Sequence, residues 1–183
     1  FIIFTLLAFL AVVFYLDVIK YILQPDYWEG LRVVPIVMAA EVFMGIYFNL
    51  SFWYKLTDQT YWGAILSLIG CVVLLAVNVI FIPRYSYMAC AWGGVAGYGT
   101  AMLLSYFVGQ KKYPIDYPLL SIGVYVLIAG LFTAIMMLLP GDWPTWLRLS
   151  INTVLIVMFV GHIIYHDLPL KSLPLIGRLT NKK

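Results

Sequence analysis

The stretch from Arg32 to Lys55 limits what this chain can fold into more than any other part of the sequence. It is almost wholly apolar, and its only cations stand at its two ends. Because a helix rises about 1.5 Å per residue, a stretch of this length can cross the roughly 30 Å hydrocarbon core of a bilayer. Glu41 lies near its middle, and Gly45 and Asn49 follow at four-residue steps on the same helical face. A carboxyl group in mid-membrane costs on the order of 2.5 kcal/mol or more, so we expect this face to meet other helices or water.

The composition indicates an all-α integral membrane protein. Hydrophobic residues make up 64% of the chain and charged residues 10%, against about 25% charged in an average soluble domain. The net charge of +3 is too small to argue for a nucleic-acid partner. Cys71 and Cys90 lie in apolar segments, which predicts buried thiols and neither a disulfide framework nor a metal site. The chain begins at Phe1 inside a hydrophobic run, so we expect it to be a fragment of a longer protein.

Six hydrophobic segments predict six transmembrane helices. Their approximate bounds are 1–23, 32–55, 61–82, 87–108, 117–139 and 146–165. The connections between them are short and hold prolines and charged residues, while tyrosines and tryptophans gather near the segment ends, as in the aromatic belts of membrane bundles. The runs are continuous and do not alternate, which favours helices over a β-barrel.

The cations predict that the C-terminus is cytoplasmic. The loops after the second and fourth segments and the tail hold Lys55, Lys111, Lys112, Lys171, Arg178, Lys182 and Lys183. The opposite side holds Lys20, Arg32, Arg84 and Arg148. Cytoplasmic loops carry an excess of lysine and arginine, and with six spans the same side also holds Phe1. The excess of cations on the cytoplasmic side depends on the four cations of the tail, Lys171, Arg178, Lys182 and Lys183.

Glu41 is the one acidic residue deep inside a predicted span, and two interpretations stay open. As a packing residue, it would be neutral or hydrogen-bonded, with Asn78 or Asn152 of a neighbouring helix as its partner. As a functional residue, it would be a protonatable or cation-binding group that lines a polar cavity. Asn49, Asn78 and Asn152 are the other candidates for transport or ion coupling.

Small residues recur at four-residue spacing in the fourth segment. They are Gly93, Gly97, Ala101 and Ser105. This spacing favours close helix packing, because lipid offers no hydrophobic force that would drive helices together. The alternative is a surface that slides or bends during transport. In the third segment, Gly63, Ser67, Cys71, Leu74 and Asn78 share one face in the same way.

The sixth segment places Arg148, Asn152, His162 and His166 roughly on one face. Histidines four residues apart could bind a metal or shuttle protons. No third ligand lies nearby in the sequence, so we favour anchoring at the membrane interface. No phosphate-binding glycine loop and no nucleophile with a base at motif spacing is present in the sequence, and we expect neither an enzyme nor a cofactor.

Several short motifs follow one another in a characteristic order between Gln24 and Ile115. A span ends in P-x-Y, the next opens with Pro-Ile and closes with NLSFWYKLT, and the following one ends in NVIFIP before a glycine-rich helix that leads to SYFVGQK. In this order the chain resembles the polysaccharide exporters of the multidrug/oligosaccharidyl-lipid/polysaccharide superfamily, the Wzx-type O-antigen flippases. The glycine that usually follows the Ile-Pro motif is replaced here by Ser86.

The resemblance implies a MATE-like fold of fourteen helices, with two lobes of six and a terminal pair. Residues 1–109 would be four helices of the C-terminal lobe, 117–165 the terminal pair and 166–183 a basic cytoplasmic tail. The N-terminal half would be missing from this chain.

The implied activity is alternating access that moves polyprenyl-diphosphate-linked oligosaccharides across the bacterial inner membrane, for polysaccharide and lipopolysaccharide synthesis. Lys55, Arg84 or Arg148 would meet the diphosphate, and a proton or sodium ion bound at Glu41 would couple transport. Membrane lipids would surround the helices. The alternatives are a multidrug exporter of the same superfamily, a membrane enzyme of polysaccharide assembly, which the short loops disfavour, and a purely structural subunit.

Overall fold

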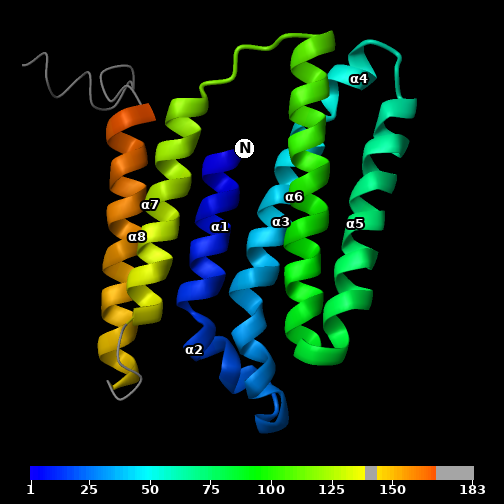
Figure 1. Cartoon of the computed structure of the whole chain (residues 1–183). Coiled ribbons are helices and arrows are strands. Elements are labelled where there is room, and N and C mark those ends of the chain that lie inside the picture. The colour runs from blue at the N-terminus through cyan, green and yellow to red at the C-terminus, as the bar shows by residue number, and fades with distance from the viewer. Residues whose placement is uncertain (139–143, 168–183) are drawn as a thin grey trace, which may run out of the picture. The chain divides into compact units, whose positions relative to one another are not determined.

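The computed structural model describes residues 1–138 and 144–167, and in these ranges it is helical, without strands (Figure 1). The prediction of an all-α protein is confirmed. The helices are α1 (Ile2–Phe14), α2 (Leu16–Ile19), η1 (Lys20–Ile22), η2 (Pro25–Val33), α3 (Val34–Leu50), α4 (Phe52–Leu56), α5 (Tyr61–Tyr85), α6 (Tyr87–Lys112), α7 (Leu119–Leu138) and α8 (Thr145–Asp167), where η marks a 3₁₀-helix. The predicted tail, apart from its first two residues, lies outside the described residues.

The long apolar helices give the chain the makeup of a multi-pass membrane protein. Within the described ranges, four helical runs are long and apolar enough to span a membrane: Pro25–Leu56, Tyr61–Tyr85, Leu119–Leu138 and Thr145–Tyr165. The bent pair Ile2–Phe14 and Leu16–Ile22 would count as a fifth. The 26-residue helix α6 is not among them, because its glycines and tyrosines lower its hydropathy. Six spans therefore stay a prediction.

Several helix ends differ from the sequence-based bounds. Helix α6 continues to Lys112, although the predicted span ends at residue 108, and the second segment is divided into α3 and α4 at Ser51. The first segment is interrupted at Tyr15, where the sequence predicts one helix over 1–23. Helix α5 continues through Pro83 to Tyr85, although the predicted span ends at residue 82. Because proline lacks the N–H that would donate to the carbonyl four residues back, the last turn of α5 has one helical hydrogen bond fewer at Pro83.

The helices form two compact units. One contains residues 3–19 with α7 and α8, and the other contains residues 20–119. Helices α1 and α2 thus group with the last two helices. The predicted division into residues 1–109 and 117–165 stays a prediction about the whole transporter.

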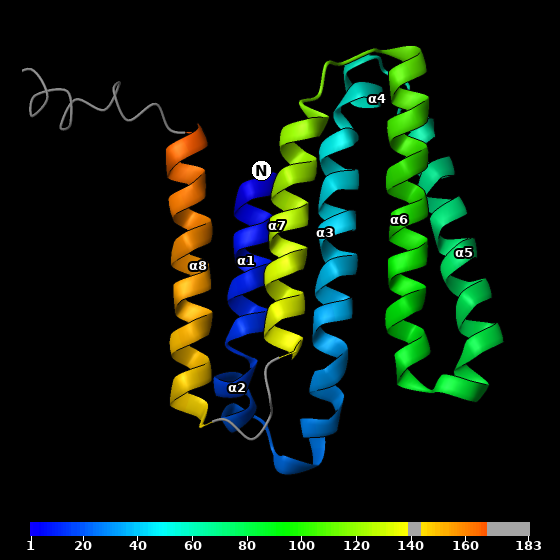
Figure 2. The ribbon, with the colours of Figure 1, turned by 60° about the vertical axis from the view of Figure 1, so that its left-hand side comes forward.

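In the unit of residues 20–119, α6 packs against both α3 and α5 (Figure 2). Besides Ala91, its buried positions are spaced four residues apart and are Ala89, Gly93, Gly97, Ala101, Ser105 and Gly109. A Cβ atom added at Gly97 would lie 2.7 Å from Leu74 Cβ and 2.8 Å from the carbonyl oxygen of Gly70. The small residues therefore bring the backbones of α5 and α6 into direct contact.

Cys71 and Cys90 are free thiols that are exposed on α5 and α6, so the prediction of buried thiols is wrong. The reason is helical phase. Gly70 packs against α6, and Cys71, one residue further along the helix, lies at the edge of this contact, where its thiol stays exposed.

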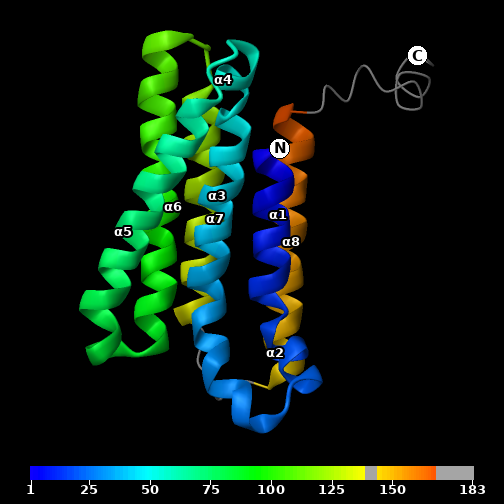
Figure 3. The same cartoon turned by 90° about the vertical axis from the view of Figure 1, so that its right-hand side faces the viewer.

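In the other unit, α1 has a buried apolar side, and a hydrogen bond joins its C-terminal end to α8. Leu10, Val13 and Phe14 of α1 are fully buried. Tyr125 of α7 meets two rings of α8 edge to face, at centroid distances of 6.4 Å for Phe159 and 5.7 Å for His162. Figure 3 shows α1 beside α8, with α2 at the lower end of α1.

Candidate functional site

Glu41 and Asn49 lie on the face of α3 that is not packed against its neighbours. The buried positions of this helix include Ala40, Tyr47 and Leu50. Glu41 and Asn49 are exposed, as are Val37 and Phe48 of the same helix. Gly45, the third residue of the predicted polar face, is partly buried, so what this face meets stays a prediction.

Within the part of the chain that the structure describes, Glu41 has no hydrogen bond and no ion pair. The two partners that the packing interpretation names for it are placed elsewhere. Asn78 points its Oδ1 atom at Gly93 of α6. Asn152 donates a hydrogen bond to α1. The carboxyl group of Glu41 thus depends on water, or on groups outside the unit of residues 20–119, for its solvation.

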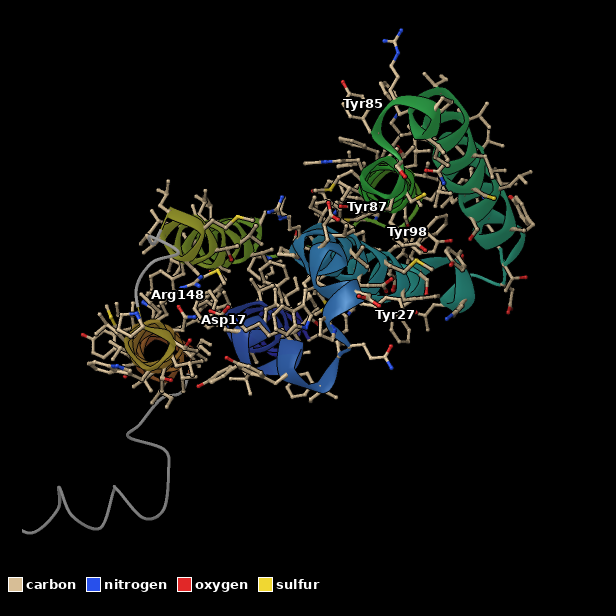
Figure 4. All side chains as sticks on the ribbon, turned by 90° about the horizontal axis from the view of Figure 1, so that it is seen from below. Asp17, Tyr27, Tyr85, Tyr87, Tyr98 and Arg148 are labelled. Atoms are coloured by element: carbon tan, nitrogen blue, oxygen red, sulfur yellow. The ribbon has the colours of Figure 1, made fainter. Side chains whose placement is uncertain are left out.

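A small pocket lies where α3, α5 and α6 meet. Its volume is about 220 Å³, and Tyr47, Ser67 and Tyr98 are among its lining residues, with Tyr98 labelled in Figure 4. Tyr47 Oη lies 2.8 Å from Ser67 Oγ and 3.2 Å from the carbonyl oxygen of Gly63. Pockets that hold drug-sized ligands measure roughly 300–1,000 Å³. This pocket is too small for an oligosaccharide, and Glu41 does not line it.

A second group of polar residues joins the break after α1 to the first half of α8. Asn152 is 0% exposed, and its Nδ2 atom donates to the carbonyl oxygen of Phe14 at 2.8 Å. Tyr15 Oη lies 2.9 Å from Thr153 Oγ1. Arg148 Nη1 lies 3.1 Å from Asp17 Oδ2, with side chains that are 20% and 16% exposed (Figure 4).

The three cations predicted to meet a diphosphate do not form one cluster. Arg148 is paired with Asp17, which neutralises its charge. Lys55 ends α4 just before α5 begins, whereas Arg84 lies in the last turn of α5. Helix α5, which lies between Lys55 and Arg84, separates these two residues by roughly 35 Å. Lys55 Nζ lies 5.5 Å from the ring centroid of Phe52, and both cations are exposed.

The histidines of α8 lie in different settings. His162 contacts the ring of Tyr125, and the side chain of His166 lies outside what the structure describes. Among the described residues, no three His, Cys, Asp or Glu side chains gather in a way that could hold a metal ion.

Asp17 lies near the end of the first predicted span, and the sequence alone assigns it no role. The signal that could have drawn attention to it is the acid itself inside an apolar segment, which calls for a cation on another helix.

No protein-family model, no curated protein and no solved structure matches this chain.

Proposed function

We propose that this chain is the C-terminal part of a membrane transporter, a flippase that moves polyprenyl-diphosphate-linked oligosaccharides across the bacterial inner membrane. One observation carries the proposal: Glu41 and Asn49 occupy the unpacked face of α3, within an apolar run that is long enough to span a membrane. A carboxyl group that faces lipid without a partner is unfavourable. A water-filled substrate cavity would solvate this face, and a multi-pass transporter provides such a cavity.

In this proposal all six segments cross the membrane within a MATE-like fold, and the C-terminus is cytoplasmic. The bent α1–α2 pair counts as one span. Helix α6 counts as another, because its small residues pack against α3 and α5 and it therefore needs fewer large apolar side chains than a lipid-exposed helix does. The order of the motifs between Gln24 and Ile115 supports the choice of superfamily.

Glu41 would bind the coupling proton or sodium ion, and Asn49 would contribute an amide to the same face. Lys55 and Arg84 would attract the anionic diphosphate at opposite membrane surfaces, because they lie at opposite ends of α5. Arg148 would be available to the substrate only after separating from Asp17.

A multidrug exporter of the same superfamily is the second candidate. The observation that favours it is the pair of exposed phenylalanines that follow Glu41 in the same apolar run, Phe48 at the end of α3 and Phe52 at the start of α4. An acid beside aromatic rings suits a lipophilic cation, which the ring faces and the carboxylate attract together.

The decisive experiment uses the full-length protein that contains this chain in a strain that lacks its own flippase. Wild type should restore surface polysaccharide. Glu41→Gln should reduce it by about tenfold or more, because a charge-assisted interaction of roughly 1.5–3 kcal/mol is lost. Glu29→Gln, which changes an exposed acid in η2, is the matched control and should behave as wild type.

Protein levels are measured in the membrane fraction for each variant. Full restoration by Glu41→Gln would assign Glu41 to packing and remove the main support for the proposal. A wild-type protein that restores no polysaccharide but confers resistance to lipophilic cations would favour the multidrug exporter.

A further inference from the structure

The first span bends although its local sequence does not require a bend. The segments Ile2–Phe14 and Leu16–Ile22 meet at an angle of 51°, and this stretch contains neither proline nor glycine. Sharp kinks arise almost always at these residues, at π-bulges, or where a side chain inserts into the ladder of helical hydrogen bonds. The cause of this bend must therefore lie elsewhere in the molecule.

The hydrogen bonds at the break show such an insertion. In a continuous α-helix the N–H of Val18 would donate to the carbonyl oxygen of Phe14. Here it donates to Tyr15 O at 2.9 Å, and Ile19 N–H donates to the same oxygen at 3.0 Å. Phe14 O instead accepts a hydrogen bond from Asn152 Nδ2 of α8. The carbonyl has thus exchanged a donor in its own helix for a fully buried side chain of another helix.

Contacts on both sides of this hydrogen bond come from the same part of α8. Thr153 meets Tyr15 at the break itself. Arg148, one turn before Asn152, is paired with Asp17 on α2, beyond the break. Helix α8 therefore contacts the carbonyl at the end of α1, the interrupting residue and the segment that has turned away.

We propose that the first span is a two-state element, straight or bent, and that α8 selects the bent state by supplying Asn152 in place of the Val18 amide. In the straight state Phe14 O is paired within its own helix, and in the bent state it is paired only while Asn152 is in reach. An unpaired buried carbonyl is unfavourable, so few intermediate geometries are populated. A shift of α8 along its axis would withdraw Asn152 and straighten the span. This inference does not depend on the nature of the transported substrate.

Electron spin resonance distance measurements on the whole protein in lipid nanodiscs test the inference. Cys71 and Cys90 are replaced by alanine, because both thiols are exposed. One pair of spin labels replaces Val18 on α2 and Ser150 on α8, two exposed positions on either side of the contact. A second pair, at Phe4 and Val157, reports on α1 and α8 away from the break.

Asn152→Leu keeps the branching and the number of non-hydrogen atoms of the side chain and removes the amide. We expect the 18–150 distance to shift by about 5 Å, because four residues at roughly 1.5 Å each swing through the 51° bend. The 4–157 distance should stay unchanged. Asn49→Leu, the same substitution at an exposed position of α3, is the control and should alter neither distance.

An 18–150 distribution in Asn152→Leu that overlays the wild-type one would overturn the inference, since the bend would then be intrinsic to the first span. If Asn152→Leu disturbs both distances, Arg148→Met is the second variant, because it leaves the Asn152 hydrogen bond in place. It should broaden only the 18–150 distribution. Loss of both distances in this variant as well would also refute the proposal, because these contacts would then attach α8 as a whole and not set the bend.

Discussion

At the scale of single residues, Ser86 has a backbone conformation that suits glycine. It connects α5 to α6 with φ 50° and ψ −132°. Residues with a Cβ atom adopt this region at a cost of roughly 1–3 kcal/mol, whereas glycine enters it freely. The strain at Ser86 therefore comes from its Cβ atom, which glycine lacks.

We therefore expect Ser86→Gly to stabilise the protein by about 1 kcal/mol, after the greater flexibility of glycine in the unfolded chain is subtracted. The measurement is the midpoint of thermal unfolding in detergent, followed by tryptophan fluorescence. Ser150→Gly, at an exposed position inside α8, is the opposite control and should lower stability by roughly 0.5–1 kcal/mol. A lower midpoint for Ser86→Gly would contradict the strain argument.

The sequence identified the polar residues of the spans but not their partners. Arg148 and Asn152 stand out as polar groups in an apolar segment, and so does Glu41. That Asn152 meets a backbone carbonyl could not be predicted, because this carbonyl is free only when the first span is broken at Tyr15. The break in turn comes from contacts with α8, more than a hundred residues away in the chain.

At the scale of helices, the contact between α5 and α6 depends on the absence of side chains. Gly97→Leu would place a side chain within 3 Å of Leu74 and of the backbone of Gly70. Because backbone atoms cannot move aside as a flexible side chain can, we expect a loss of about 3 kcal/mol and a smaller yield of monodisperse protein. Size-exclusion chromatography and thermal unfolding measure both effects.

Gly130→Leu in α7 is the matched control, because a Cβ atom added there meets nothing within 4 Å. It should leave the thermal midpoint unchanged or raise it slightly, since leucine favours helix more than glycine does. Equal destabilisation by both substitutions would show that the cost comes from helix propensity and not from the contact between α5 and α6.

Hydrophobic length and turn residues predicted the long helices well, because each of those helices is bounded by charged residues or proline within a few positions. It was harder to predict which face of each helix packs against its neighbours. The second segment is apolar around almost its whole circumference, so its sequence could not show that Ala40 and Tyr47 would be packed and Glu41 left open. The packing partners decide which face of the helix is buried, and these partners lie on other helices.

At the scale of the whole molecule, the number of membrane crossings depends on α6. This helix has 26 residues, which at about 1.5 Å each exceeds the roughly 30 Å of the hydrocarbon core. Its mean hydropathy is nevertheless below that of the helices that qualify as spans. If α6 crosses the membrane, Ser86 and Lys111, near its two ends, face opposite compartments, and the cation distribution predicts that Lys111 is on the cytoplasmic side.

Single cysteines at positions 86 and 111, in the full-length protein lacking Cys71 and Cys90, test this directly. In intact cells a membrane-impermeant maleimide should label the cysteine at 86 and not the one at 111, and permeabilised cells should be labelled at both. The cysteine-free parent controls for labelling of other groups. Because α5 and α6 are in backbone contact along Gly70 and Gly97, a crossing by one requires a crossing by the other. Labelling of both cysteines from the same side would thus reduce the number of spans and remove the topology on which the transporter proposal depends.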